Sequence, residues 1–185
     1  MGRTFNECRA PVLNRGKPTV SFLDELVDWG ATAPEEIFSE NDNYDVYSHV
    51  KDTLGPWTGL KHRRAVMLEV LRVLAGFESS WNWNAGRDVL NPSANTPCTE
   101  EAGILQCSGN SMNFDPSLKA LLVSVSGQSD CNTFRRVTKE NHPFALEYTA
   151  RLIRFTVNHH GPLKRREIHP WLRRSAVDEF RGFLP

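Results

Sequence analysis

Residues 59–79 read GLKHRRAVMLEVLRVLAGFES and form the longest segment of the chain with a helical pattern. Met67, Val70, Leu71 and Leu74 follow the i, i+3, i+4, i+7 spacing that places apolar side chains on one face of an α-helix. A helix of this length spans about 30 Å, the diameter of a small domain. We therefore expect one central helix here, around which the rest of the chain packs.

Glu78 lies on the same apolar stripe, one further step of four residues after Leu74. Because an α-helix turns about 100° per residue, Glu78 projects within about 20° of Met67. A carboxyl group in an apolar surround has its charged form disfavoured, so its pKa rises and it can act as a general acid near neutral pH. The alternative is a glutamate at a helix end that bends to water or accepts a hydrogen bond from a loop amide.

Other segments carry helix start and stop signals, and together they predict a mainly helical fold. We treat residues 1–185 as a single domain, in which residues 1–58 form a mostly irregular or helical N-terminal extension packed on the rest. The expected helices are SFLDELVDWG, from Ser21 as cap to Gly30; APEEIF, from Pro34; FDPSLKALLVSVSG, with Asp115 as cap, Pro116 next and Gly127 at the end; HPFALEYTARLIRFTVNHHG, from Pro143; and SAVDEFRGFL, capped by Ser175.

The composition excludes some classes of function. Lys plus Arg equals Asp plus Glu at 22 each, so the chain lacks the net positive charge of a nucleic-acid-binding protein. Acids dominate from Asp24 to Asp52 and bases after Arg151, which indicates either two faces that attract each other or a basic surface for an anionic polymer. No apolar run reaches about 18 residues, and the first residues lack the apolar core of a signal peptide. We expect no membrane insertion and no Sec-type signal.

The four cysteines form an even set without a Cys-x-x-Cys pair, which allows two disulfides. Cys98 and Cys107 bracket a short loop with two acids, so we expect them to pair, and Cys8 to pair with Cys131. Such bonds would place the protein in an oxidising compartment. Four buried free thiols are the alternative.

Residues 82–113 are rich in Asn, Gly, Pro, Ser and Thr, and loops of this length tend to be functional. Trp81 and Trp83 offer flat apolar faces beside several asparagines, which is the mixture that sugar rings require. The tryptophans could equally belong to the core. Asp88, Glu100 and Glu101 are candidates for the second carboxylate of a glycoside-cleaving enzyme, or are simply solvated acids.

Other polar residues have weaker claims. His159, His160 and His169 lack a carboxylate or cysteine at ligand spacing, so we expect no metal site and no cofactor. Ser79 and Ser80 lack a histidine in a triad context, so we expect them to orient Glu78 or the loop.

Glu78-Ser79-Ser80, followed after the polar loop by AGILQ at 102–106, resembles the Glu-Ser and Gly-Leu-Met-Gln signature of goose-type lysozymes and lytic transglycosylases. The resemblance covers Leu71 to about Ser108 and extends weakly to FTVNHHGPL at 155–163. GRD, TEEAGILQCS and the cysteines look more specifically like bacterial type VI secretion muramidase effectors.

This resemblance implies a lysozyme-like fold, α+β at most, and cleavage of the β-1,4 bond between N-acetylmuramic acid and N-acetylglucosamine in peptidoglycan. Glu78 would be the general acid. Ser79, Trp81, Gln106, Asn158 and His159 would line the sugar cleft. Delivery by a type VI machine into the periplasm of a recipient bacterium, and a cognate immunity protein that blocks the cleft, are further implications.

The chain departs from the family at Ser108, where goose-type lysozymes usually carry an aspartate two residues beyond the Gln. Asp88 or Glu101 must then activate water, or no residue does. We expect hydrolysis. A lytic transglycosylase, which needs no such acid, and a glycan-binding protein without turnover are the alternatives.

Overall fold

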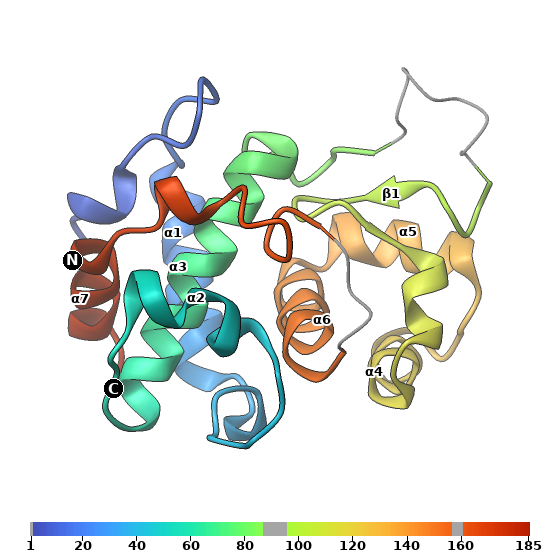
Figure 1. Ribbon diagram of the computed structural model, residues 1–185. Coiled ribbons are helices and arrows are strands. Elements are labelled where there is room, and N and C mark those ends of the chain that lie inside the picture. Colours follow the sequence, from blue (N-terminus) through green and yellow to red (C-terminus); the bar gives the residue numbers. More distant parts are fainter. Residues whose placement is uncertain (1, 87–95, 157–160) are drawn as a thin grey trace.

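The predicted central helix is α3, Gly59–Ser79, which places Glu78 in its last turn. This computed structural model describes residues 2–86, 96–156 and 161–185. The stretch of α3 from Ala65 to Gly76 is buried without interruption, and α1, α6 and α7 pack around the helix (Figure 1). Because every face of this stretch is covered, α3 is a core helix rather than a half-exposed one.

The mainly helical fold is confirmed, and its only strands among the described residues form a small antiparallel sheet that pairs Glu101 with Ser108 and Ala102 with Cys107. The α-helices are α1 Val20–Thr32, α2 Val46–Leu54, α3 Gly59–Ser79, α4 Pro116–Ser126, α5 Cys131–Glu140, α6 His142–Phe155 and α7 Arg174–Phe183; the strands are β1 Glu101–Ala102 and β2 Cys107–Ser108; and short 3-10 helices cover Glu7–Arg9, Glu35–Ile37, Gly109–Asn113 and His169–Trp171.

Some predicted helix ends are confirmed and others are wrong. Helix α4 has the expected Asp115 cap and ends at Gly127. Helix α1 is capped by Thr19 rather than Ser21 and runs through Gly30, where a Cβ atom would lie 2.7 Å from the Leu68 side chain. Gly30 therefore permits close packing against α3 and does not end the helix.

Two further expectations differ from the structure. The segment APEEIF forms only the 3-10 turn Glu35–Ile37, and α7 begins at Arg174, so that Ser175 lies inside it. Helices α2 and α5 had no counterpart among the predicted elements. Both are short, and Asp45 and Asp130 cap them through backbone N–H groups.

One hydrophobic cluster runs from Phe5 to Leu184, so residues of the N-terminal segment share the core of the later helices in a single domain. A fully buried ion pair lies within this core, where Arg72 binds Glu69 on α3 at 2.7 Å. Arg72 also donates to the Ala10 carbonyl oxygen, and Glu69 accepts from the Arg173 backbone N–H. These bonds fix both ends of the chain to α3 and so hold in place the helix that carries Glu78. None of the helices in the described ranges could cross a membrane.

Candidate active site

The end of α3 has an unusual backbone that determines where Glu78 points. Ser80 and Trp81 both adopt left-handed conformations, with φ of 56° and 59°, and the Trp81 N–H donates to the Ala75 carbonyl oxygen. The indole ring then folds back onto Gly76, where a Cβ atom would lie 2.5 Å from the ring. The indole Nε1 donates to the Arg72 carbonyl oxygen at 3.0 Å. These contacts of Trp81 fix the backbone conformation at the end of α3.

Trp81 was expected to bind substrate, but its side chain is 7% exposed and belongs to the core. Trp83 lies elsewhere, stacked on His142 at 3.7 Å between ring centroids. Neither indole lines the cleft beside Glu78. Trp81 points inward because Gly76 has no side chain and leaves room for the indole ring.

Ser79 fastens the next structural element to the helix end. Its Oγ donates to the Ile104 carbonyl oxygen at 2.7 Å, from the turn between β1 and β2, and also lies 3.2 Å from the Ala75 carbonyl oxygen. The residue orients the turn, as one of the two sequence interpretations held, and it does not line the cleft.

A cleft of about 380 Å³ opens beside Glu78. Its walls come from the end of α3, the β1–β2 hairpin, the 3-10 helix Gly109–Asn113, α6 and the segment 161–165. Of the predicted site residues, Glu78, Glu101 and Gln106 all line it, together with Ser108. The structure therefore brings together three residues that are separated by up to 28 positions in the sequence.

Glu78 is the perturbed carboxyl group of this cleft. Its pKa is raised to about 7, first by burial and then by the negative charge of Glu101. The guanidinium of Arg165 lowers this pKa, whereas Glu167 raises it. A substantial fraction of Glu78 is therefore protonated at neutral pH, which is the state that a general acid requires.

The hairpin presents Gln106 and Glu101 from a tight turn. Gly103 has a φ of 75° and packs on Thr138, where a Cβ atom would lie 2.7 Å from a methyl group. Gln106 also has a positive φ, of 47°, and its Nε2 donates to the Gly103 carbonyl oxygen at 2.7 Å. One side of the Gln106 amide is thus engaged within the turn.

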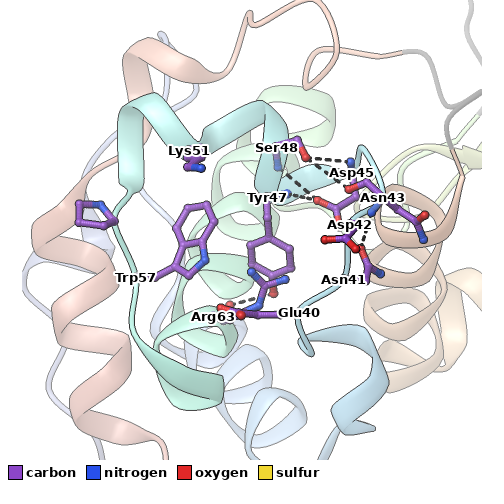
Figure 2. Close-up of a pocket in the computed structure, with 11 residues that line it drawn as sticks. Glu40, Asn41, Asp42, Asn43, Asp45, Tyr47, Ser48, Lys51, Trp57 and Arg63 are labelled. Atoms are coloured by element: carbon purple, nitrogen blue, oxygen red, sulfur yellow. Dashed lines mark hydrogen bonds between the residues drawn. The ribbon is translucent and has the colours of Figure 1, made fainter.

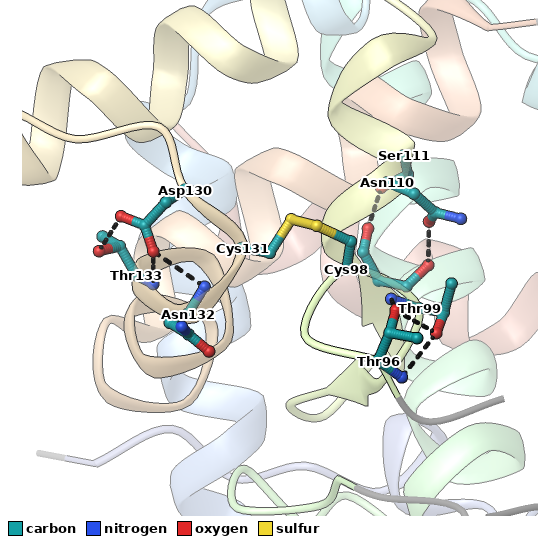
Figure 3. The surroundings of a disulfide bond; sticks show 10 residues. Thr96, Cys98, Thr99, Asn110, Ser111, Asp130, Cys131, Asn132 and Thr133 are labelled. Atoms are coloured by element: carbon teal, nitrogen blue, oxygen red, sulfur yellow. Dashed lines mark hydrogen bonds between the residues drawn. A yellow bond between two sulfur atoms is a disulfide. The ribbon is translucent and has the colours of Figure 1, made fainter. Parts of the chain in front are cut away.

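The disulfide prediction is wrong. Cys98 bonds to Cys131 at the start of α5, as Figure 3 shows, while Cys8 and Cys107 are buried free thiols. Cys107 lies on β2 opposite Ala102, and its Sγ lies 3.2 Å from the Thr149 Oγ1 on α6. Because the hairpin directs Cys107 toward α6, it cannot reach Cys98, although the two are near in sequence.

Cys8 is equally remote from its expected partner. Its Sγ donates to the Ala176 carbonyl oxygen of α7 at 3.5 Å. Burial raises the pKa of the Cys107 thiol to about 12 and that of Cys8 as well, so neither is a reactive thiolate at neutral pH.

Two links attach the hairpin segment to α5. The first is the disulfide, and the second is the ion pair in which Arg135 binds the Glu100 carboxylate at 2.6 Å. Glu100 is therefore engaged on α5, and its neighbour Glu101 is the acid that reaches the cleft. The sequence did not distinguish Glu100 from Glu101, but the structure places one on α5 and the other in the cleft.

Three predicted site residues, Asp88, Asn158 and His159, lie outside the described residues. Among the residues that the structure describes, no group of three or more His, Cys, Asp or Glu side chains is placed to hold a metal ion. Arg165 and Phe114 also line the cleft and were not singled out as site residues. The only sequence signal for Arg165 was its place in a basic run.

The arrangement supports one type of chemistry. A protonated carboxyl group can donate to a leaving oxygen, a second carboxylate can stabilise positive charge or activate water, and the polar groups beside them can bind hydroxyl groups. Comparison with protein-family models, with curated proteins and with solved structures gave no match for the chain.

Proposed function

We propose that this protein is a peptidoglycan muramidase that hydrolyses the β-1,4 bond between N-acetylmuramic acid and N-acetylglucosamine. The observation that carries the proposal is the pKa of Glu78, which is raised to about 7 inside a cleft that also contains Glu101. Glu78 acts as the general acid that protonates the glycosidic oxygen. Glu101 acts as the base, with Asp88 as the other candidate for that role.

The choice of substrate rests on the lining of the cleft and on the resemblance in sequence. The cleft combines the aromatic ring of Phe114 with the amide of Gln106 and the hydroxyl of Ser108, a mixture that suits a sugar ring with an apolar face and polar edges. The two halves of the goose-type signature, Glu78-Ser79 and Ala102–Gln106, are joined by the bond from Ser79 to Ile104.

A second mechanism is favoured by Ser108. This residue lines the cleft at the position where goose-type lysozymes carry an aspartate, and its Oγ donates to the Asn110 Oδ1 at 2.6 Å. If no carboxylate activates water, Glu78 acts first as acid and then as base, and the enzyme is a lytic transglycosylase.

Product masses separate these mechanisms. Purified peptidoglycan is digested and the soluble fragments are weighed, with Glu78→Gln as the inactive reference. Hydrolysis gives reducing muropeptides one water heavier than the 1,6-anhydro products of lytic cleavage. Release of no fragments by wild type would instead support a glycan-binding protein, whereas equal release by wild type and Glu78→Gln would show that cleavage does not depend on Glu78.

The biological setting is part of the proposal and rests on the resemblance to type VI effectors. The toxin is delivered by that secretion machinery into the periplasm of a neighbouring bacterium, and an immunity protein in the producing strain covers the cleft. The chain fused to an export signal should lyse cells, whereas cytoplasmic expression should be tolerated. A folded, exported form that is harmless would contradict this setting.

A further inference from the structure

A second and larger pocket, of about 590 Å³, lies away from Glu78. Its walls come from residues 40–43 and Asp45, from α2, from the segment before α3 and from Arg63 of α3, as Figure 2 shows. It shares no lining residue with the cleft. A ligand of this pocket would therefore bind at a site separate from Glu78 and Glu101.

The base of the pocket contains a buried cation with an available donor. Arg63 is only 5% exposed, its guanidinium lies 3.6 Å from the centroid of the Tyr47 ring, and its Nε and Nη2 donate to the carbonyl oxygens of Phe38 and Ser39. Nη1 has no hydrogen-bond partner among the described residues and is not fully buried. Its N–H groups can therefore donate to an oxygen of a ligand.

Trp57 forms an apolar wall next to this donor. The indole is partly buried, packs against Tyr47 at 5.5 Å between ring centroids, and has exposed Pro56 beside it. The Arg63 guanidinium lies 5.7 Å from the indole centroid. A partly buried indole that lines a pocket and packs on Tyr47 is suited to stack on the apolar face of a sugar ring.

Exposed amides and carboxylates line the rim opposite, from Glu40, Asn41, Asp42 and Asn43. Amides both donate and accept hydrogen bonds, and carboxylates accept them from hydroxyl or amide N–H groups. Asp45 is paired with Arg154, so the acids Glu40 and Asp42 are matched by the bases Lys51 and Arg63, and the lining has no excess charge that would select an ionic ligand. The lining therefore favours a neutral ligand rich in hydroxyl and amide groups.

A smaller hollow of about 180 Å³ adjoins the pocket. Asp45 lines both this hollow and the pocket. The hollow is also lined by Leu163 and Lys164, which lie between two cleft residues, Pro162 and Arg165, in the sequence. The hollow therefore borders the pocket at Asp45 and borders the cleft segment 162–165 at Leu163 and Lys164.

We propose that this pocket is a second carbohydrate-binding site, which holds a neutral N-acetylated sugar of a glycan strand through Trp57, Arg63 and the rim amides. The sugar ring stacks on Trp57, a hydroxyl or acetamido oxygen accepts from Arg63, and the remaining hydroxyl groups bind the rim. The assignment of the strand to peptidoglycan rests on the proposed function. The binding of a sugar by this pocket does not depend on the proposed function.

The test measures binding without turnover. Oligomers of N-acetylglucosamine are titrated into full-length Glu78→Gln protein, and the indole N–H signal of Trp57, assigned by its loss in Trp57→Ala, is followed by NMR. We expect this signal to move. Asp42→Ala, at the exposed rim, should weaken the binding reported by that signal about tenfold through the loss of a charged hydrogen-bond acceptor.

Matched controls keep the result specific. Trp171→Ala removes another partly buried indole outside the pocket, and Asp178→Ala removes an exposed carboxylate from α7. Both should leave the shift of the Trp57 signal unchanged. A stem peptide of peptidoglycan, titrated separately, should not move that signal.

A Trp57 signal that stays in place at saturating sugar, or that responds only to the peptide, would overturn the proposal. So would equal weakening by Asp42→Ala and Asp178→Ala. The proposed function is tested separately, by measuring whether the wild-type protein releases fragments from peptidoglycan and Glu78→Gln does not. A chain that binds sugar at Trp57 but cuts no glycan would retain the second site and lose the muramidase.

Discussion

Glu78 and Glu101 line the same cleft from different elements, and the negative charge of Glu101 adds to burial in raising the pKa of Glu78. Glu78 therefore keeps its proton up to a higher pH than an ordinary carboxyl group does. In glycoside-cleaving enzymes such a difference separates the acid from the base.

Glu78→Gln should lower the rate of peptidoglycan cleavage by about two powers of ten or more, because the amide retains the shape of the side chain but has no acidic proton to donate. The rate is measured from fragments released by purified peptidoglycan. Glu140→Gln is the matched control, since Glu140 is an exposed acid on α5 that pairs with Arg136. Equal rates for wild type and Glu78→Gln would rule out Glu78 as the acid.

The pH profile should respond to both neighbours of Glu78. Activity requires the protonated form, so it should fall as the pH rises through about 7. Glu101→Gln removes a charge that raises the pKa, so the alkaline limb of the profile should move to lower pH. Arg165→Ala removes a charge that lowers the pKa and should move the limb to higher pH. Limbs that move in the same direction in both variants would contradict the electrostatic assignment.

The rate of Glu101→Gln carries separate information about mechanism. If Glu101 activates water, the substitution should lower the rate sharply at every pH while the thermal unfolding midpoint stays nearly unchanged. Asp88→Asn gives the same comparison for the other candidate. A silent result for both, together with 1,6-anhydro products, would identify the lytic mechanism that Ser108 favours.

Glu78 should also make folding stability depend on pH. Its native pKa of about 7 lies above the value of about 4.3 in an unfolded chain, so the native state binds the proton more tightly. The free energy of unfolding therefore has its full value below about pH 4. It decreases as the pH rises from the unfolded to the native pKa, and it is constant above the native pKa. Gln does not ionise, so the stability of Glu78→Gln relative to wild type should increase by about 4 kcal/mol from acid to alkaline pH. Urea unfolding at several pH values measures this, and a constant difference between the proteins would refute it.

The Cys98–Cys131 bond predicts a definite thiol count. Alkylation of unfolded but unreduced protein should modify two cysteines, Cys8 and Cys107, and reduction beforehand should raise the number to four. Modification of none before reduction would mean two disulfides and would contradict the free state of Cys8 and Cys107. Cys131→Ser should lower the free energy of unfolding by about 2 to 4 kcal/mol, since the bond closes a loop of more than 30 residues.

The sequence was most informative where one helix determined both the fold and the candidate acid. The apolar stripe of α3 predicted its position, and the same stripe predicted that Glu78 points toward the interior. Helix α4 was equally predictable, because the cap, the proline and the terminal glycine are all local signals. Helices α2 and α5 were missed because their caps lie in polar stretches that resemble loops, although α5 buries Phe134, Val137 and Thr138 at helical spacing.

Features that depend on tertiary contacts could not be predicted. Nothing local distinguishes Cys107 from Cys131 as the partner of Cys98, because the choice depends on where α5 lies relative to the hairpin. Trp81 is buried only because the backbone turns at Ser80 and Gly76 leaves room for the ring. Glu100 and Glu101 are adjacent and chemically alike, and only the position of Arg135 separates them.

The Cys98–Cys131 bond closes the chain into a covalent ring that contains the hairpin, the 3-10 helix Gly109–Asn113 and α4. A protease that cuts this ring once, for example at the exposed surface of α4 around Val123 and Val125, would not release a fragment. The nicked protein would migrate as one chain until a reductant separates it into two. In a protease-rich environment the hairpin that carries Glu101 could therefore survive a cut that would free the end of an open chain.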